Sequence, residues 1–286
     1  MGFAIASGVQ VRAGGLVVLE TGNERLVVFD DQYRPLRYIG RAGAGPGELR
    51  GAVGLAAWRN EYAVVEVNNA RVSVFDTSGA FIRSFPVPNG FSNIAYGPDG
   101  TIYVNSYDRE NYLFAAERDG ALRPFARRPL QFYPPDLLAS PQTISGYVHF
   151  TVTADGSVYV YDQVLAAMVA FDTAGQSTGV RRLPRRLEEG LRERAALVAK
   201  DFGGDGRGAP ASLSDLTLTD DGRLLLLFQN FGAIGLLIDP RSEEVREIRW
   251  GPDVDPALAG FGGVVRGDVF YRLTMDNLRL FRLTPE

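Results

Sequence analysis

One pattern recurs six times along the chain and limits its fold more than any other feature. Each copy has an apolar run, a polar link, and a second apolar run that often ends in Phe-Asp. Residues 16–30 and 63–76 show it most clearly. Six copies in 286 residues take roughly 48 residues each, the length of a four-stranded propeller blade. The chain is therefore predicted to be all-β, with residues 1–286 forming a single six-bladed β-propeller domain.

Turn chemistry divides the copies into blades. Asp-Gly pairs end at Gly100, Gly156 and Gly222, between two strand runs each time, and suit tight hairpins. The sixth copy has only three strands, so residues 2–6 are expected to add its fourth strand and remove two exposed sheet edges. The blades are expected at approximately residues 8–40, 52–86, 91–127, 147–183, 212–249 and 258–283, with 2–6 completing the last.

Composition excludes several classes of protein. The chain has no cysteine, which rules out disulfides, thiolate chemistry and the common cysteine-based metal sites. It has one histidine, His149, and one lysine, Lys200, so imidazole and Schiff-base chemistry have one candidate each. A net charge of −4 argues against a nucleic-acid partner. No apolar run reaches the length of about 18 residues that is needed to span a membrane.

The amino-terminal segment resembles no signal peptide, since it lacks a basic start and a long apolar run. The chain is expected to be periplasmic or extracellular if an export signal was removed, and cytoplasmic otherwise. A monomer is expected.

Three segments resemble the NHL-type six-bladed propeller family. They are residues 20–25, which read ETGNER, residues 66–71, which read EVNNAR, and the glycine loop GAGPGEL at 43–49. This loop is similar to the interblade linkers of bacterial exported six-bladed propellers. The resemblance covers about residues 8–125, while blades four to six keep the strand rhythm and lose the Asn-x-Arg element. It implies the fold and leaves the function open, because the family includes binding modules and lyases.

The long connections predict where a ligand would bind. With the strands of a blade named A to D from the channel outward, the connections B–C and D–A emerge on one face. The long segments 41–52, 129–146 and 184–211 are all D–A connections. Connections of this length are usually functional or disordered, so this face is predicted to bind the ligand. Leu187, Leu191, Ala195 and Val198 predict a short helical insertion between blades four and five, either a lid or a helix packed on the rim.

Candidate ligand-binding residues lie in or beside these connections. Exposed aromatic rings suit recognition of peptides or sugars, although they also pack insertions onto a rim. An arginine cluster at 181–186 suits an anionic ligand, although nearby glutamates offset its charge. The predicted ligand-binding set is Phe132, Tyr133, Tyr147, His149, Tyr107, Asn230 and Arg186.

Catalytic and metal sites have weaker candidates. His149 begins an inner strand, where an imidazole serves as a base or as a hydrogen-bonded structural group. Polar residues recur at the B–C links, and such oxygens suit Ca²⁺ or Mg²⁺ in a channel. Glu20 and Glu66 have Arg25 and Arg71 nearby, which favours blade-stabilising ion pairs instead. The possible metal ligands are Glu20, Glu66, Asn105, Asp162 and Asp276, with Asn230 at the equivalent place in blade five.

The sequence favours a non-enzymatic propeller that binds a protein, a peptide or a small molecule without a cofactor. The alternative is a metal-assisted lyase or lactone hydrolase. A lyase is implied by the resemblance to streptogramin-lyase-like propellers, which use a channel histidine and a metal. A lactone hydrolase is implied by the resemblance to gluconolactonase-like propellers, which hold an ion with Glu, Asn and Asp. A third possibility is a scaffold in a cell-envelope complex. The glycine loop lacks the Lys-Ser/Thr of a phosphate-binding loop and is predicted to be a tight connection between blades.

Overall fold

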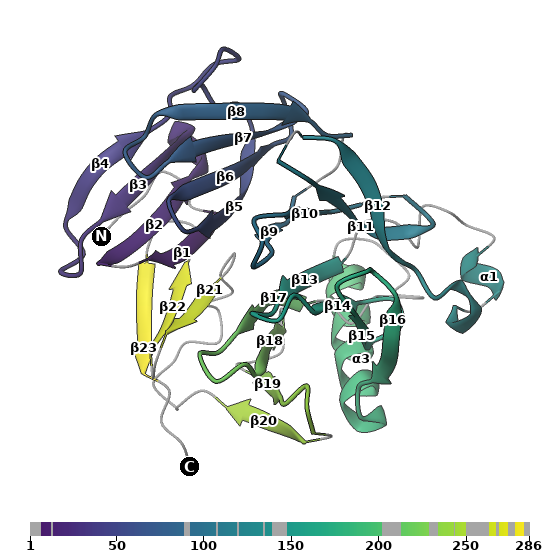
Figure 1. Ribbon diagram of the computed structural model, residues 1–286. Coiled ribbons are helices and arrows are strands. Elements are labelled where there is room, and N and C mark those ends of the chain that lie inside the picture. The colour runs from purple at the N-terminus through teal and green to yellow at the C-terminus, as the bar shows by residue number, and fades with distance from the viewer. Residues whose placement is uncertain are drawn as a thin grey trace. The chain divides into compact units, whose positions relative to one another are not determined.

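The strands predicted from the repeats are present in a computed structural model of the chain (Figure 1). The structure describes residues 7–12, 14–88, 92–106, 108–118, 120–133, 135–138, 148–201, 213–228, 234–242, 244–249, 263–266, 269–273 and 278–282. Within these residues the chain forms five four-stranded antiparallel sheets and one three-stranded sheet, with strands adjacent in sequence also adjacent in each sheet. The strand expected at residues 2–6 lies outside the described residues.

The first three sheets carry the residues of the first three predicted blades. They consist of β1 (Gly8–Arg12), β2 (Gly15–Glu20), β3 (Arg25–Phe29) and β4 (Pro35–Ile39); β5 (Ala52–Trp58), β6 (Glu61–Glu66), β7 (Arg71–Asp76) and β8 (Phe81–Pro86); and β9 (Ile94–Tyr96), β10 (Ile102–Asn105), β11 (Asn111–Ala116) and β12 (Leu122–Arg127). The repeat predicts the four strands of blade two near residues 54–58, 62–66, 71–75 and 80–85, and β5 to β8 agree with these bounds within two residues at each end.

The remaining sheets follow in the same order. They consist of β13 (Val148–Val152), β14 (Val158–Asp162), β15 (Ala167–Phe171) and β16 (Ser177–Arg182); β17 (Leu213–Leu218), β18 (Leu224–Phe228), β19 (Ile234–Ile238) and β20 (Val245–Arg249); and β21 (Gly263–Arg266), β22 (Val269–Leu273) and β23 (Leu278–Arg282). The described helical segments are η1 (Thr21–Asn23), η2 (Leu130–Phe132), α1 (Pro135–Leu138) and α3 (Arg185–Asp201).

Hairpin glycines adopt the backbone conformation that the sequence predicts. Gly100, Gly156 and Gly222 have φ angles of 89°, 86° and 81°. Glycine adopts this left-handed region without the steric cost that other residues carry. The Asp-Gly pairs therefore set the short turns between the first and second strands of their sheets.

Residues 1–105, 113–124 and 260–286 group into one compact unit, and residues 106–112 and 125–259 group into a second unit. Within unit 1, Leu19, Leu26 and Val28 pack in one hydrophobic cluster with Tyr62 and Phe75 of the next sheet. A second cluster joins strands β5 to β8 to strands β9 to β11. The second strands β2 and β6 are buried on both faces, whereas the fourth strand β4 is mostly exposed. Inner strands of each sheet thus carry the core. The single-domain expectation stays a prediction.

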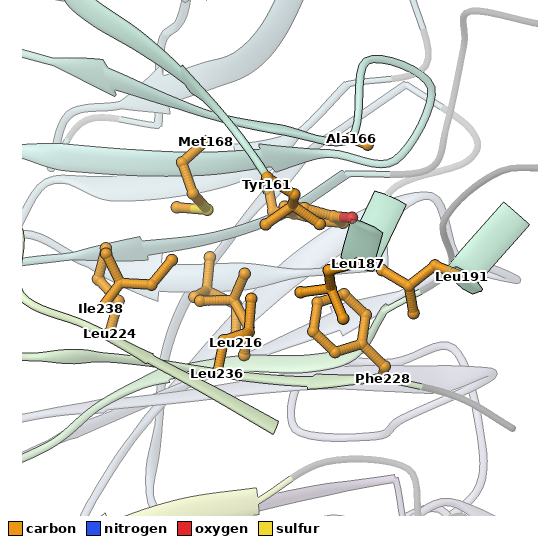
Figure 2. Packing of buried hydrophobic residues seen from close by; sticks show 12 residues of the cluster. Tyr161, Ala166, Met168, Leu187, Leu191, Leu216, Leu224, Phe228, Leu236 and Ile238 are labelled. Atoms are coloured by element: carbon orange, nitrogen blue, oxygen red, sulfur yellow. The ribbon is translucent and has the colours of Figure 1, made fainter. Parts of the chain in front are cut away.

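Within unit 2, the helix α3 is packed against two sheets (Figures 1 and 2). Its Leu187 and Leu191 lie in a buried cluster with Tyr161 of β14 and Phe228 of β18. Glu188 accepts a hydrogen bond from Arg192 Nε at 2.9 Å, and Arg192 Nη2 donates to the Val164 carbonyl at 2.8 Å. The predicted helix and its apolar side are confirmed for residues 187 and 191. The first half of α3 therefore packs on the sheets through Leu187 and Leu191.

No helix within the described residues is long and apolar enough to cross a membrane.

Candidate functional site

The side chains that end the second strands lie in the same place in four sheets. Glu20 ends β2, Glu66 ends β6, Asn105 ends β10 and Asp162 ends β14. All four are buried, with relative exposures of 4%, 0%, 0% and 1%. A buried carboxylate needs strong partners, because leaving water is costly for a charge. The partners of these four groups therefore decide what chemistry remains open to them.

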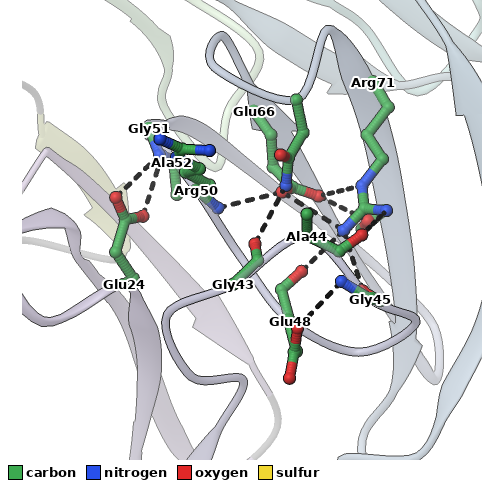
Figure 3. A network of polar contacts seen from close by, with 12 residues as sticks. Glu24, Gly43, Ala44, Gly45, Glu48, Arg50, Gly51, Ala52, Glu66 and Arg71 are labelled. Carbon is green, nitrogen blue, oxygen red and sulfur yellow. Dashed lines mark hydrogen bonds and ion pairs between the residues drawn. The ribbon is translucent and has the colours of Figure 1, made fainter.

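Glu66 is held by donors of its own sheet and of the connection 41–52, which contains the glycine loop (Figure 3). Its carboxylate accepts hydrogen bonds from Arg71 Nε at 2.8 Å, Ser73 Oγ at 2.5 Å and the Arg50 backbone N–H at 3.0 Å. Arg71 in turn donates to the carbonyl oxygens of Ala44, Gly45 and Glu48. In the same way, Arg25 Nε lies 2.6 Å from Glu20 Oε2. The predicted structural ion pairs are present.

Several backbone amides of the connection 41–52 already have hydrogen-bond partners. Gly51 and Ala52 donate to the Glu24 carboxylate at 2.7 and 3.1 Å, and Gly45 donates to Glu48 at 2.8 Å (Figure 3). A phosphate-binding loop needs such amides to point at its ligand. The geometry therefore fits an interblade connection.

Asp162 forms the centre of a buried cluster in unit 2. Its carboxylate accepts from the Tyr112 hydroxyl at 2.7 Å, from the Tyr133 hydroxyl, and from the backbone N–H groups of Val164 and Leu165. Burial, and then the charge of Asp162, raise the pKa of both tyrosines above the ordinary value. Both hydroxyls therefore keep their protons and stabilise the carboxylate.

Arg128 completes this cluster from the end of β12. Its Nε donates to the Asp108 carbonyl at 3.3 Å. Its Nη1 donates to the Tyr133 hydroxyl at 3.4 Å and lies 3.6 Å from the Asp162 carboxylate. The guanidinium lies 4.5 Å from the centre of the Tyr112 ring. Its Nη2 is buried and has no hydrogen-bond partner. The cluster therefore retains one unsatisfied donor.

A matching unsatisfied acceptor lies at the start of β11. Asn111 Nδ2 donates to the Asp108 carboxylate at 3.1 Å, whereas Asn111 Oδ1 is buried and has no partner. Asp108 thus contacts both Asn111 and Arg128. Asn111 and Arg128 are not among the candidate residues that the sequence predicts. The signal available was their position, since Asn111 follows a B–C link and Arg128 directly precedes a long D–A insertion.

The predicted aromatic residues divide into exposed, buried and undescribed ones. Phe132 in η2 is 46% exposed, as recognition of a ligand requires. Tyr133 is buried and packs against Leu165 and Ala167. Its ring is therefore not exposed to a ligand, and its hydroxyl belongs to the buried cluster around Asp162. Arg186 lies exposed in the first turn of α3. Tyr107, Tyr147, Asn230 and Asp276 lie outside the described residues.

His149 lies apart from the Asp162 carboxylate. In the register of β13 and β14, His149 is opposite Tyr161 and Val148 is opposite Asp162. Successive side chains of a strand point to opposite faces, so His149 and Asp162 lie on different faces of their sheet. His149 is half-buried and makes contacts within the chain. The two residues therefore do not form a hydrogen-bonded His-Asp pair.

The described second-strand ends do not fit a Ca²⁺ or Mg²⁺ site. Such ions take six or more oxygen ligands, whereas the Glu20, Glu66 and Asp162 carboxylates are engaged by donors of the chain. Asn105 Oδ1 accepts from the backbone N–H groups of Ser92 and Asn93, at 2.9 and 2.8 Å. Among the described residues, no group of three or more His, Asp or Glu side chains could hold a metal ion.

Comparison with protein-family models and with curated proteins gives no match to the sequence. Solved structures give clear matches. Virginiamycin B lyase from Staphylococcus aureus matches with a TM-score of 0.63 and 12% identity, over 97% of this chain and 81% of the lyase. A catalytically inactive His-to-Ala variant of that lyase with quinupristin matches with a TM-score of 0.62 and 13% identity, over 96% and 78% of the two chains.

A putative exported protein from Bacteroides fragilis matches with a TM-score of 0.60 and 14% identity, over 94% of this chain and 79% of the other. At these identities the similarity shows the fold alone. Together with the sheets of consecutive antiparallel strands, it defines the chain as a β-propeller protein.

Proposed function

We propose that this chain is a non-enzymatic propeller that binds a peptide, a protein or a small molecule at its insertion side. The insertion side is the end of the sheets where the B–C links and the D–A connections lie. One observation carries the proposal: the buried Glu20, Glu66 and Asp162 carboxylates are each bonded to donors of the chain. These groups stabilise the sheets and are not free to act as bases or metal ligands. The exposed Phe132 remains available for contact with a ligand.

The proposal includes six blades of the NHL type, with residues 2–6 as the fourth strand of the sheet β21–β23. The repeat supports it, since the described part of that sheet has three strands and the other sheets have four. The proposal also includes a monomeric protein that acts outside the cytoplasm. The similarity to a putative exported protein supports this location.

A panel of uncharged capped tripeptides tests the binding function. A ligand that binds only the folded state at ten times its Kd stabilises the protein by about 1.4 kcal/mol. At least one peptide is expected to raise the melting temperature, and Phe132→Ala is expected to remove the rise. Ile82→Ala is the matched control, because Ile82 is 44% exposed but lies in unit 1, on β8. No rise with any peptide would exclude a peptide ligand, and equal loss in both variants would overturn the assignment of the contact to Phe132.

The second candidate function is a metal-assisted lyase or lactone hydrolase, with His149 as its base. The similarity to virginiamycin B lyase favours it, as does the catalytically inactive His-to-Ala variant of that enzyme. Incubation with quinupristin and Mg²⁺, followed by chromatography, separates the two functions. A binding propeller leaves quinupristin unchanged. If turnover occurs, His149→Ala should reduce it by about 10²-fold or more, as loss of a general base does. For a binding propeller, this substitution costs only about 1 kcal/mol of stability.

A further inference from the structure

We propose that Arg128 and Asn111 recognise an uncharged amide group of the ligand, such as a peptide bond. This inference rests on the proposed binding function and names the chemical class of its ligand. The site lies in unit 2, where the end of β12, the turn at 108–110 and the start of β11 meet at the insertion side.

Arg128 supplies a donor with a defined direction. Its side chain is 1% exposed, and its contacts with Asp108, Tyr133 and the Tyr112 ring fix the plane of the guanidinium. Nη2 is the part of this plane that has no partner. A buried polar group without a partner is costly, and each such group in a native structure calls for an explanation. A ligand carbonyl would satisfy it.

Asn111 supplies the acceptor. Its Nδ2 donates to the Asp108 carboxylate, which fixes the orientation of the amide, and Oδ1 is left buried and unpaired. The Arg128 backbone N–H donates to the Glu110 carbonyl at 2.7 Å, so the two residues are attached to adjacent parts of one turn. One unpaired donor and one unpaired acceptor complement a group that offers both a carbonyl oxygen and an N–H. An amide is such a group.

Charge distinguishes an amide from an anion. Arg128 brings one positive charge, and its Nη1 lies 3.6 Å from the Asp162 carboxylate. The Asp108 carboxylate lies on the other side of the pair, where it accepts from Asn111 Nδ2 at 3.1 Å. A carboxylate or phosphate ligand would therefore meet two negative charges for one positive charge, which is unfavourable where water is excluded. An uncharged amide avoids this repulsion.

Phe132 offers an exposed apolar ring on the segment that follows Arg128. It belongs to η2, which starts two residues after Arg128, and its backbone N–H donates to the Pro129 carbonyl at 3.0 Å. Small-ligand sites are mostly apolar with a few placed polar groups, and an exposed ring on this segment would supply the apolar part.

Two matched probes test the inference by ¹⁵N NMR on the full chain. N-acetylglycinamide offers two uncharged amides, and N-acetylglycine keeps the first amide and has a carboxylate in place of the second, so the two probes differ in charge on the same skeleton. N-acetylglycinamide is expected to shift the backbone signals of residues 108–112 and the Arg128 Nε–H signal in a saturable way. N-acetylglycine is expected to bind at least tenfold more weakly. Equal binding of the two probes, or shifts that avoid these residues, would overturn the inference.

Arg128→Lys keeps the charge and removes the planar donor group, so it should weaken N-acetylglycinamide at least tenfold. Its ¹⁵N spectrum reports whether it folds. Phe132→Ala, a substitution at the surface, provides a second variant and should weaken binding at least threefold, while Ile82→Ala leaves binding unchanged. If tripeptides bind through Phe132 but Arg128→Lys binds them equally well, this inference fails and the binding function stands. If neither a peptide nor N-acetylglycinamide binds, this inference fails, and the peptide class of ligand is excluded from the binding function.

Discussion

Truncation of Arg71 tests whether the glycine loop is held by its buried ion pair. In the folded chain Arg71 bonds to the Glu66 carboxylate and to the carbonyl oxygens of Ala44, Gly45 and Glu48. Arg71→Ala removes all of these donors and leaves a fully buried carboxylate with weaker partners. Breaking a buried pair by removing one partner costs about 3–5 kcal/mol.

The structure places the expected value at the lower end of this range. Arg71 retains 16% exposure, and Glu66 keeps its hydrogen bonds from Asn69, Ser73 and the Arg50 N–H. These contacts still stabilise the charge after Arg71 is lost. We therefore expect a decrease of about 3 kcal/mol in the free energy of unfolding.

Urea denaturation followed by tryptophan fluorescence measures this decrease, because Trp58 lies in β5 of unit 1. Arg34→Ala is the matched control. Arg34 also pairs with a carboxylate, that of Asp30, but its side chain is 70% exposed. Exposed pairs contribute about 0–1 kcal/mol. An effect of Arg71→Ala no larger than that of Arg34→Ala would refute the argument that the pair holds the loop.

Three other substitutions probe the helix, the ring and the hairpins. Leu191→Ala should lower the free energy of unfolding by about 2–5 kcal/mol in urea denaturation, because Leu191 of α3 is buried against the sheets. The control Leu36→Ala, on the exposed β4, should lower it little. Equal decreases would contradict the packing of α3 on the sheets. Deletion of residues 1–7 should lower the melting temperature substantially if 2–6 close the last blade, and an unchanged temperature would exclude closure. Hydrogen bonds from Arg223 and then Thr219 lower the pKa of Asp221 from 3.8 to about 2. Its stabilisation is complete above pH 3.8 and is lost as pH falls through about 2. Asp221→Asn should thus lose less stability between pH 4 and pH 2, and an identical acid profile would contradict this assignment.

Local chemistry determined the strands and turns of this chain. Alternating and continuous apolar runs between Asp-Gly pairs specify hairpins without reference to the rest of the molecule, which is why β5 to β8 lie where the repeat predicts them. The repeat also determined that Glu20, Glu66, Asn105 and Asp162 occupy equivalent strand ends. The pairing of Glu66 with Arg71 was predictable too, because the two residues are separated only by one short turn.

Tertiary structure decided which polar groups remain unpaired. The sequence left open whether Tyr133 contacts a ligand or packs its insertion onto the rim, and packing against Leu165 and Ala167 buries it. Asp162 meets Tyr112, which is 50 residues away in sequence. Contacts between residues this far apart depend on how two sheets pack, and local pattern carries no information about that packing. Whether Arg128 Nη2 and Asn111 Oδ1 have partners depends on this packing as well. A buried donor or acceptor is unpaired only when no surrounding residue in the folded chain supplies a partner.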